Sequence, residues 1–295
     1  MNNKVLSWVI LLSLAIVWGS SFILIKKGLL YFSSLEVGAL RIVITYIFLI
    51  PLAAGRIREL TARDWKYLAI VGIVGSGAPA FLFALAQTGI DSNLAGILNS
   101  LTPLFTLFIG LAFFNLRTRW FNIAGVIIAL VGAAGLISVS GGRGFEFNIK
   151  YAVFVIIATI CYAINVNVVK AHLRHLTSVT ITVFSFFLIG PPVLIFLLAG
   201  TPFIHKMATD ASNLAGLGYL AILSIVGTAL ALFAFNKLIK MASPVFASSV
   251  TYIIPVVAVI WGVIDGEPFE AIYALWIVFI IVGVFLVNYN YRRRI

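Results

Sequence analysis

Apolar runs, each about as long as a bilayer is thick, fill most of the chain and are separated by short polar connections. A helix needs about 20 apolar residues to cross roughly 30 Å of hydrocarbon. By this measure the pattern predicts ten membrane-spanning helices, at residues 6–25, 36–54, 67–87, 94–114, 120–138, 151–170, 180–199, 214–235, 244–264 and 271–289. The short connections leave no room for a soluble domain. The predicted fold is therefore an all-α integral membrane protein.

A long stretch of this pattern occurs twice, since residues 67–110 match residues 219–262 without a gap. The matched positions include residues that apolar composition alone would rarely align, namely Tyr67/Tyr219, Gly75/Gly227, Pro103/Pro255 and Gly110/Gly262. The pattern therefore indicates that the chain arose by duplication of one ancestral half. The glycine-rich loop at 140–144 is the expected joint. This predicts an N-terminal repeat at 1–143 and a C-terminal repeat at 144–295 within a single membrane domain.

Five helices per repeat is an odd number, and this has a geometric consequence. A helix and its partner five spans later must cross the membrane in opposite directions, so the two repeats are expected to be inverted relative to each other. Such folds place a substrate site near the bilayer midplane between the repeats and alternate access by rocking them. The pattern thus favours a transporter with two inverted five-helix repeats around a central cavity.

Composition and charge agree with this prediction. The chain is 62% hydrophobic and only 10% charged, far from the usual soluble range of about 25% charged. The net charge of +11 comes from Lys and Arg residues that concentrate on one side when the N-terminus is placed inside, as the positive-inside rule requires. We therefore expect both termini to be cytoplasmic, in a multi-pass protein of the cytoplasmic membrane. The basic charge is a topology signal, and no nucleic-acid partner is expected.

Three features resemble the EamA-type members of the drug/metabolite transporter superfamily: the fragment Trp18-Gly19-Ser20-Ser21-Phe22, Arg41 early in the second span, and Ala/Gly-rich fourth and ninth spans that carry Pro103 and Pro255. The resemblance covers nearly the whole chain. It implies a basket of ten helices whose cavity is lined by spans 1, 3, 4, 6, 8 and 9, with spans 5 and 10 more peripheral. It also implies export or exchange of small metabolites, often amino acids.

Aromatic and small polar residues inside the spans are the candidates for the cavity. Trp18 and Ser21 share one face of span 1, and their inverted counterparts in span 6 are Tyr162 and Asn165. Together they could stack on a polar metabolite and hydrogen-bond to it. The alternative is aromatic packing, with the hydroxyl bonded back to its own helix.

Spans 4 and 9 add further polar candidates around their prolines. An unpaired polar group facing lipid would be costly, so these side chains must face protein or a water-filled cavity. We expect cavity positions for Asn99, Thr102, Ser248, Thr251 and Tyr252. The alternative is interhelical bonding worth roughly 0.6 kcal/mol each.

Arg41 is the one clear cation inside a predicted span, where it costs about 2.5–3.5 kcal/mol on insertion scales unless water, an anion or a partner meets it. It is a candidate for drawing a substrate carboxylate, with a structural lock or snorkelling to headgroups as the alternative. Pro79, Pro103 and Pro255 are candidates for helix kinks or gating points, since proline frees a backbone carbonyl.

The predicted function is a secondary transporter that moves small polar metabolites such as amino acids by alternating access. No Asp or Glu falls deep within a predicted span, which favours facilitated diffusion or exchange over proton coupling. The alternatives are efflux of hydrophobic drugs or lipids and an intramembrane lipid-modifying enzyme, for which no nucleophile or metal motif is present. No cofactor and no metal site are expected, and the residues do not indicate an oligomeric state.

Overall fold

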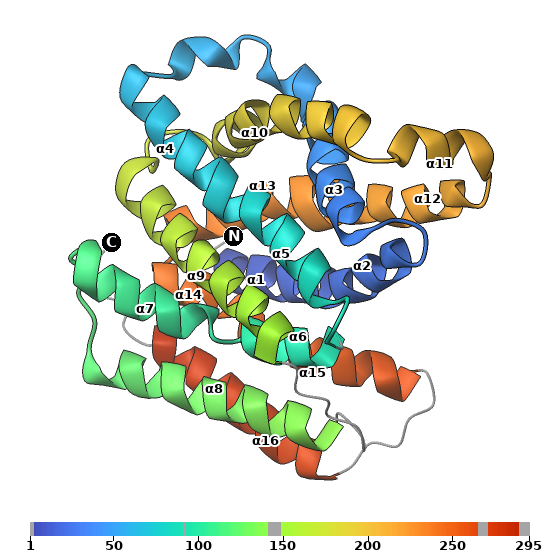
Figure 1. Cartoon of the computed structure of the whole chain (residues 1–295). Helices are drawn as coiled ribbons and strands as arrows, with labels where there is room; N and C mark the ends of the chain where they lie inside the picture. Colours follow the sequence, from blue (N-terminus) through green and yellow to red (C-terminus); the bar gives the residue numbers. More distant parts are fainter. Residues whose placement is uncertain (1–2, 91, 141–148, 265–270, 289–295) are drawn as a thin grey trace.

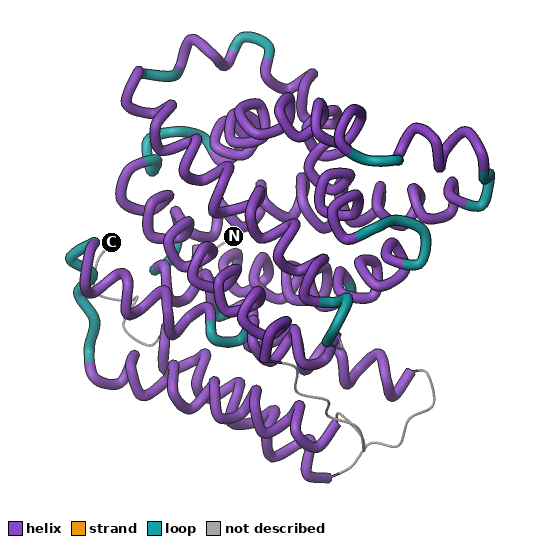
Figure 2. Tube along the Cα trace, viewed as in Figure 1, coloured by secondary structure: helices purple, strands orange, loops and turns teal. Residues whose placement is uncertain are grey.

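The computed structural model describes residues 3–90, 92–140, 149–264 and 271–288, and all regular secondary structure among them is helical (Figures 1 and 2). The helices of the first repeat are α1 (Asn3–Gly19), α2 (Ser21–Leu29), α3 (Ser34–Leu49), η1 (Ile50–Ala53), η2 (Arg56–Glu59), α4 (Ala62–Gly72), η3 (Ile73–Gly77), α5 (Ala78–Ala86), α6 (Ser92–Asn99), α7 (Thr102–Phe113) and α8 (Trp120–Ser140). Those of the second repeat are α9 (Ile149–His172), α10 (Ser178–Gly200), α11 (Phe203–Thr209), α12 (Asn213–Ser224), η4 (Ile225–Leu230), α13 (Ala231–Met241), α14 (Pro244–Ser248), α15 (Val250–Ile264) and α16 (Ala271–Asn288). The predicted joint between residues 143 and 144 lies outside the described residues and stays a prediction.

The prediction of an all-helical membrane protein is confirmed. Six helical stretches in the described part of the chain are long and apolar enough to cross a bilayer: Asn3–Leu29, Ser34–Ala53, Ala62–Ala86, Ile149–His172, Ser178–Gly200 and Asn213–Met241. The other four predicted spans correspond to shorter apolar helices, Thr102–Phe113, Trp120–Leu136, Pro244–Val257 and Ala271–Val287.

Two of these shorter spans are each built from two helices. The fourth span is α6 followed by α7, with the break at residues 100–101, and the ninth is α14 followed by α15, with the break at Ser249. The two breaks lie against each other, because the Ser100 hydroxyl donates to the carbonyl of Thr251 at 3.2 Å. Broken helices are tolerated at membrane depth only where protein or a cavity covers the exposed backbone groups.

The third and eighth spans both contain a π-helical turn. The first is η3 and the second is η4, and their starts, Ile73 and Ile225, are partners in the duplicated sequence. A π-turn is rare and occurs frequently at functional sites. Pro79 follows η3 but Ala231 stands at the matching position after η4, so a proline is not the common cause. The duplication therefore extends to an unusual backbone feature.

Side-chain contacts show that the two repeats run in opposite directions. Near the start of α1, Trp8 packs edge-on against Phe246 in α14, whereas Gly28 at the end of α2 lies against Leu220 of α12. The end of α9 lies at the same end of the bundle as α14, since Lys170 bonds to backbone carbonyls just before it. Hence α9 runs opposite to α1, as the odd number of spans requires.

Helices α8 and α16 pack along each other at one edge of the bundle, below the other helices in Figure 1. Glycines allow the close approach: a Cβ placed on Gly283 would lie 2.4 Å from the backbone nitrogen of Ala129, and one on Gly125 would lie 2.7 Å from the carbonyl oxygen of Gly283. Small residues that let backbones approach are typical of membrane helix pairs. The expectation that spans 5 and 10 are peripheral matches this arrangement.

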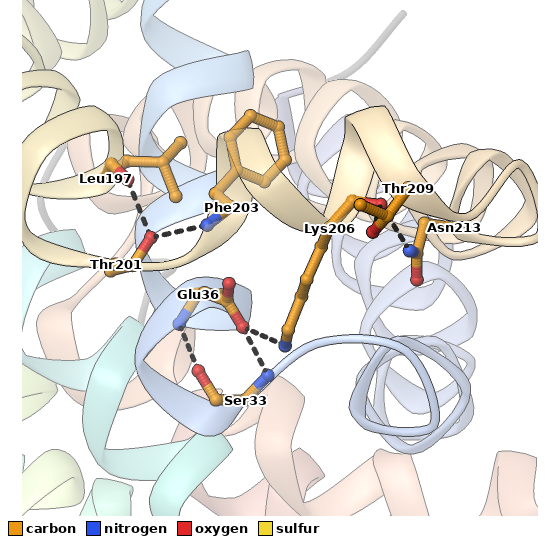
Figure 3. Close-up of polar contacts among 8 residues, drawn as sticks. All are labelled: Ser33, Glu36, Leu197, Thr201, Phe203, Lys206, Thr209 and Asn213. Carbon is orange, nitrogen blue, oxygen red and sulfur yellow. Dashed lines mark hydrogen bonds and ion pairs between the residues drawn. The ribbon is translucent and has the colours of Figure 1, made fainter.

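An ion pair between the half-buried Lys206 and the buried Glu36 joins the start of α3 to α11, at the end of the bundle that we call the Lys206 end (Figure 3). Ser33 and Glu36 form a capping box at the start of α3, and Lys206 donates to the fully buried Glu36 carboxylate at 2.7 Å. Asn213 in turn donates to the carbonyl of Lys206 at 2.9 Å. Glu36 therefore binds the second repeat and does not reach Arg41.

Candidate substrate cavity

One cavity of about 900 Å³, which includes space open to the surroundings, lies between the two repeats. Its walls come from α1, α2, α3, η3, α5, α6 and α7 of the first repeat, and from α9, α10, η4, α13, α14 and α15 of the second. Spans 2 and 7, through α3 and α10, thus contribute to the walls in addition to the six spans that the family resemblance implied.

Most of the predicted candidates meet at this cavity. The side chains that line it are Trp18, Ser21, Asn99, Thr102, Tyr162, Asn165, Ser248 and Thr251, and Arg41 lies beside them. They come from both repeats. Trp18 and Ser21 therefore line the same cavity as their inverted counterparts, Tyr162 and Asn165.

Tyr252 differs from the prediction, because it is not among the residues that line the cavity. Its side chain is fully buried and its hydroxyl donates to the carbonyl of Val126 in α8 at 3.0 Å. On an α-helix, adjacent residues such as Thr251 and Tyr252 point about 100° apart. Thr251 faces the cavity, and Tyr252 consequently joins α15 to the peripheral helix.

Most cavity hydroxyls bond back to a carbonyl one turn earlier in their own span, and three of these bonds cross the break between two helices of that span. Ser21 donates to the carbonyl of Val17 at 2.8 Å, and Thr251 donates to that of Ser248 at 3.1 Å. Thr102 donates to the carbonyl of Asn99 at 2.7 Å. These local bonds satisfy the hydroxyl protons in an apolar environment. The oxygens keep lone pairs for a solute.

Arg41 is the cation of the cavity. Its Nε donates to Thr228 Oγ1 in η4 at 2.9 Å, which holds the guanidinium at the junction of the repeats. Within the described part of the chain no Asp or Glu lies within 4 Å of it, and no carboxylate lines the cavity. The guanidinium also hydrogen-bonds with the Tyr162 side chain, and its remaining N–H donors form a fork that suits a carboxylate.

The apolar walls are mainly aromatic. Phe22, Phe83, Phe186 and Phe235 line the cavity, and the Phe83 ring stacks near Tyr162 with centroids 6.0 Å apart. Sequence reasoning missed these residues, because nearly every face of these helices is apolar and phenylalanine is frequent throughout the chain.

Ser76 and Thr228, which lie in η3 and η4, were also missed as cavity residues. In the sequence Ser76 belongs to a stripe of small residues, which indicates helix packing. The duplication held the available signal, because Ser76 and Thr228 directly follow the matched glycines Gly75 and Gly227.

The three candidate prolines have different surroundings. Pro79 and Pro103 occupy the first turns of α5 and α7, directly after η3 and after the break in the fourth span. Proline suits such a position because its missing N–H would be unpaired there anyway. Pro255 lies inside α15, beyond the break at Ser249. The fourth and ninth spans are therefore broken at different distances from their prolines.

Two lysines tie parts of the second repeat together at the opposite end of the bundle, which we call the Lys170 end. Lys170 in α9 donates to the carbonyls of Ile239, Lys240 and Ala242, at 3.0, 3.1 and 2.6 Å, where α13 ends. Lys240 in α13 donates back to the carbonyl of Leu176. The last carbonyls of a helix have no partner within the helix, so the Lys170 ammonium satisfies those at the end of α13.

A second tie at the Lys170 end joins α4 to the α9–α10 connection. His175 Nε2 lies 3.0 Å from the buried Asp64 carboxylate, which also caps its own helix through Thr61. His172 stacks on Tyr67, with ring centroids 4.0 Å apart. No group of three or more His, Cys, Asp or Glu suited to a metal occurs in the described ranges.

A cavity between two inverted helical repeats, with polar groups inside, is typical of secondary transporters. Comparison with known proteins agrees. The model of the EamA-like transporter family matches residues 6–138 and again residues 149–289, so the chain belongs to this family and carries two copies of its unit.

The chain is also similar to individual proteins of known sequence or structure. It is 26% identical to the uncharacterized inner membrane transporter YedA of Escherichia coli (strain K12), over 94% of this chain and 89% of the relative. A probable terminal-alkyne amino-acid exporter of Streptantibioticus cattleyicolor is 29% identical over 46% of this chain and 46% of its own length. A crystal structure of another protein has the same fold, with a TM-score of 0.73 and 16% identity over 97% of this chain and 98% of that one.

The chain is therefore a multi-pass membrane transporter. The prediction of EamA-type membership is confirmed. Because the family consists of transporters, the lipid-modifying enzyme is no longer a candidate.

Proposed function

We propose that the protein carries small polar metabolites such as amino acids across the cytoplasmic membrane by alternating access between its two inverted repeats. The observation that carries the proposal is Arg41, a cation held at the junction of the repeats without a carboxylate partner among the described residues. A charge inside a membrane protein is costly and marks a substrate or ion pathway. An anionic group on the solute would meet it.

The proposed mechanism follows from the contacts between the repeats at the two ends of the bundle. With both termini cytoplasmic, the Lys170 end faces the cytoplasm and the Lys206 end faces outward. Solute enters when the repeats part at the Lys170 end, which separates His175 from Asp64, binds beside Arg41, and leaves after the repeats have rocked to close that end. No carboxylate in the described chain lines the cavity, so we propose facilitated diffusion or exchange without proton coupling.

The second candidate is efflux of hydrophobic drugs or lipids, which the aromatic walls favour. Phe22, Phe83, Phe186 and Phe235 would bind an apolar solute whatever its charge. Arg41 separates the two candidates, because it would repel the cationic solutes that make up many hydrophobic drugs.

Release from proteoliposomes tests the function. Vesicles are loaded with a mixture of amino acids and organic acids and with a hydrophobic cationic dye, and efflux is followed by mass spectrometry and fluorescence without a pH gradient. Hydrogen bonds to a charged group contribute about 1.5–3 kcal/mol, so Arg41→Met should slow release of the anionic solutes about 10- to 100-fold.

Arg41→Lys is the matched variant, since it retains the charge and loses the fork of donors. It should show intermediate rates. Release of the dye alone would support the hydrophobic candidate. Equal amino-acid release by wild type and by monodisperse Arg41→Met protein would contradict the role of Arg41.

A further inference from the structure

The two π-turns face the same cavity, yet their polar groups are engaged differently. At η4 the polar groups are paired within the protein. Trp18 Nε1 donates to the carbonyl of Gly227 at 3.0 Å. Thr228 Oγ1 donates to the carbonyl of Leu223 at 3.0 Å and accepts from Arg41. The wall of the cavity formed by η4 therefore has little unused hydrogen-bonding capacity.

The polar side chains in and against η3 differ, because those of Ser76 in η3 and Asn165 in the facing helix α9 have unused acceptor oxygens. The Asn165 side chain is buried, with 3% exposure, and its Oδ1 has no hydrogen-bond partner among the described residues. The amide lies against Gly75, where a Cβ would stand only 2.6 Å from Oδ1. Next to this glycine, the Ser76 side chain also lines the cavity, without a bond to any other described residue.

An unpaired buried amide costs free energy, about 1–3 kcal/mol by mutational measures. A glycine that leaves room for such a group, in a cavity that the group lines, indicates that a ligand completes its hydrogen bonds. Asn165 offers a neutral carbonyl oxygen and Ser76 a neutral hydroxyl oxygen, both of which accept from N–H groups. A protonated amine is repelled by Arg41 and accepted by these oxygens.

We propose that Asn165 and Ser76 form the amino-group subsite of the cavity. The solute is a zwitterion whose carboxylate pairs with Arg41 and whose ammonium donates to Asn165 Oδ1 and Ser76 Oγ. The proposal rests on the proposed transport function and sharpens it. It distinguishes amino acids from organic acids that carry the same side chain without an amine.

The test compares three kinds of probe on purified wild-type protein and variants: leucine, its 2-oxo acid 4-methyl-2-oxopentanoate, and its decarboxylated amine 3-methylbutylamine. Phenylalanine and methionine, with their 2-oxo acids and amines, extend the series to other side-chain shapes. Binding is measured by competition and calorimetry, and release is measured from vesicles. Wild type should bind an amino acid at least about tenfold more tightly than its 2-oxo acid.

Two variants at one position carry the argument. Asn165→Leu removes both polar atoms and should abolish the preference, weakening amino-acid binding about tenfold while changing 2-oxo acid binding less than about threefold. Asn165→Asp keeps the shape and adds a negative charge. It should favour the amine over the 2-oxo acid by a further tenfold or so, because it attracts ammonium and repels carboxylate.

Thr159→Val is the control on the same helix. Thr159 is fully buried and donates to the carbonyl of Ile156 within α9, and it does not line the cavity. Its ligand preferences should match wild type. Equal binding of an amino acid and its 2-oxo acid by wild type, or an unchanged preference in folded Asn165→Asp, would overturn the subsite. Binding of none of the amino acids or 2-oxo acids would overturn the transport proposal itself.

Discussion

The starts of α3 and α10 are equivalent places in the two repeats, and they differ in charge. Ser33 caps α3 and Thr177 caps α10, each through its side-chain oxygen. Three residues after the cap the first repeat has Glu36 and the second has Thr180. Eight residues after it the first has Arg41 and the second Ser185. Capping geometry is thus shared, while the ionisable groups belong to the first repeat alone.

The two π-turns at the cavity likewise share a backbone feature and differ in their side-chain contacts. Gly75 and Gly227 have the same place in the backbone, yet one lies beside the unpaired Asn165 amide and the other accepts from Trp18. Backbone features have survived duplication because many packing contacts depend on them. Side chains that face the cavity have fewer neighbours to satisfy and could diverge into a charged half and a neutral half.

The largest effect should follow from breaking the charged helix start. Lys206→Met would leave the buried Glu36 carboxylate without its cation but still bonded to the Ser33 N–H, and because Lys206 is 31% exposed the loss should be about 2 kcal/mol. The corresponding change in the second repeat, Thr180→Val, disturbs hydroxyl groups 2.7 Å apart and should cost about 1 kcal/mol. Thermal unfolding in detergent measures both. Equal losses would show that the buried charge at Glu36 adds nothing.

An intermediate effect should separate the two π-turns. Gly75→Ala would place a methyl group 2.6 Å from Asn165 Oδ1 and push the amide out of position, whereas Gly227→Ala meets Ser21 Oγ at 2.9 Å. Overpacking costs about 1–3 kcal/mol, so Gly75→Ala should slow amino-acid release about tenfold. Gly227→Ala should slow it less. Initial efflux rates at matched protein content measure both effects. A larger loss for Gly227→Ala would contradict the assignment of the amino-group subsite to the η3 wall.

The smallest effect tests the division between neighbouring residues of α15. Tyr252→Phe removes one neutral hydrogen bond to Val126 and should lower stability by about 1 kcal/mol. Transport kinetics should stay at wild-type values because Tyr252 lies away from the cavity. A changed substrate preference in this variant would contradict this placement and indicate that Tyr252 lines the cavity.

The fold was largely predictable, because span length and duplication are properties that a hydropathy pattern records directly. The cavity was predictable where polar residues stand out in apolar helices, as Asn99, Thr102 and Asn165 do. Rotation of each helix was not, because spans that are apolar all round carry no signal for which face is buried. Tyr252 was therefore assigned to the wrong face, and Phe83 and Ser76 were missed.

Long-range pairing was also beyond the sequence. Nothing near Glu36 indicates Lys206, which comes from a short helix in the other repeat. The π-turns likewise depend on how η3 and η4 meet their neighbours.

The contact between the repeats at the Lys170 end sets a thermodynamic condition on the proposed transport cycle. Opening that end requires His175 to leave the buried Asp64 carboxylate. A ligand shifts a conformational equilibrium only by the difference between its affinities for the two states. Water that enters the opening would offset part of the cost by hydrating both side chains. The populations of the two access states therefore depend on hydration at this contact, and osmolytes that withdraw water should favour the closed population.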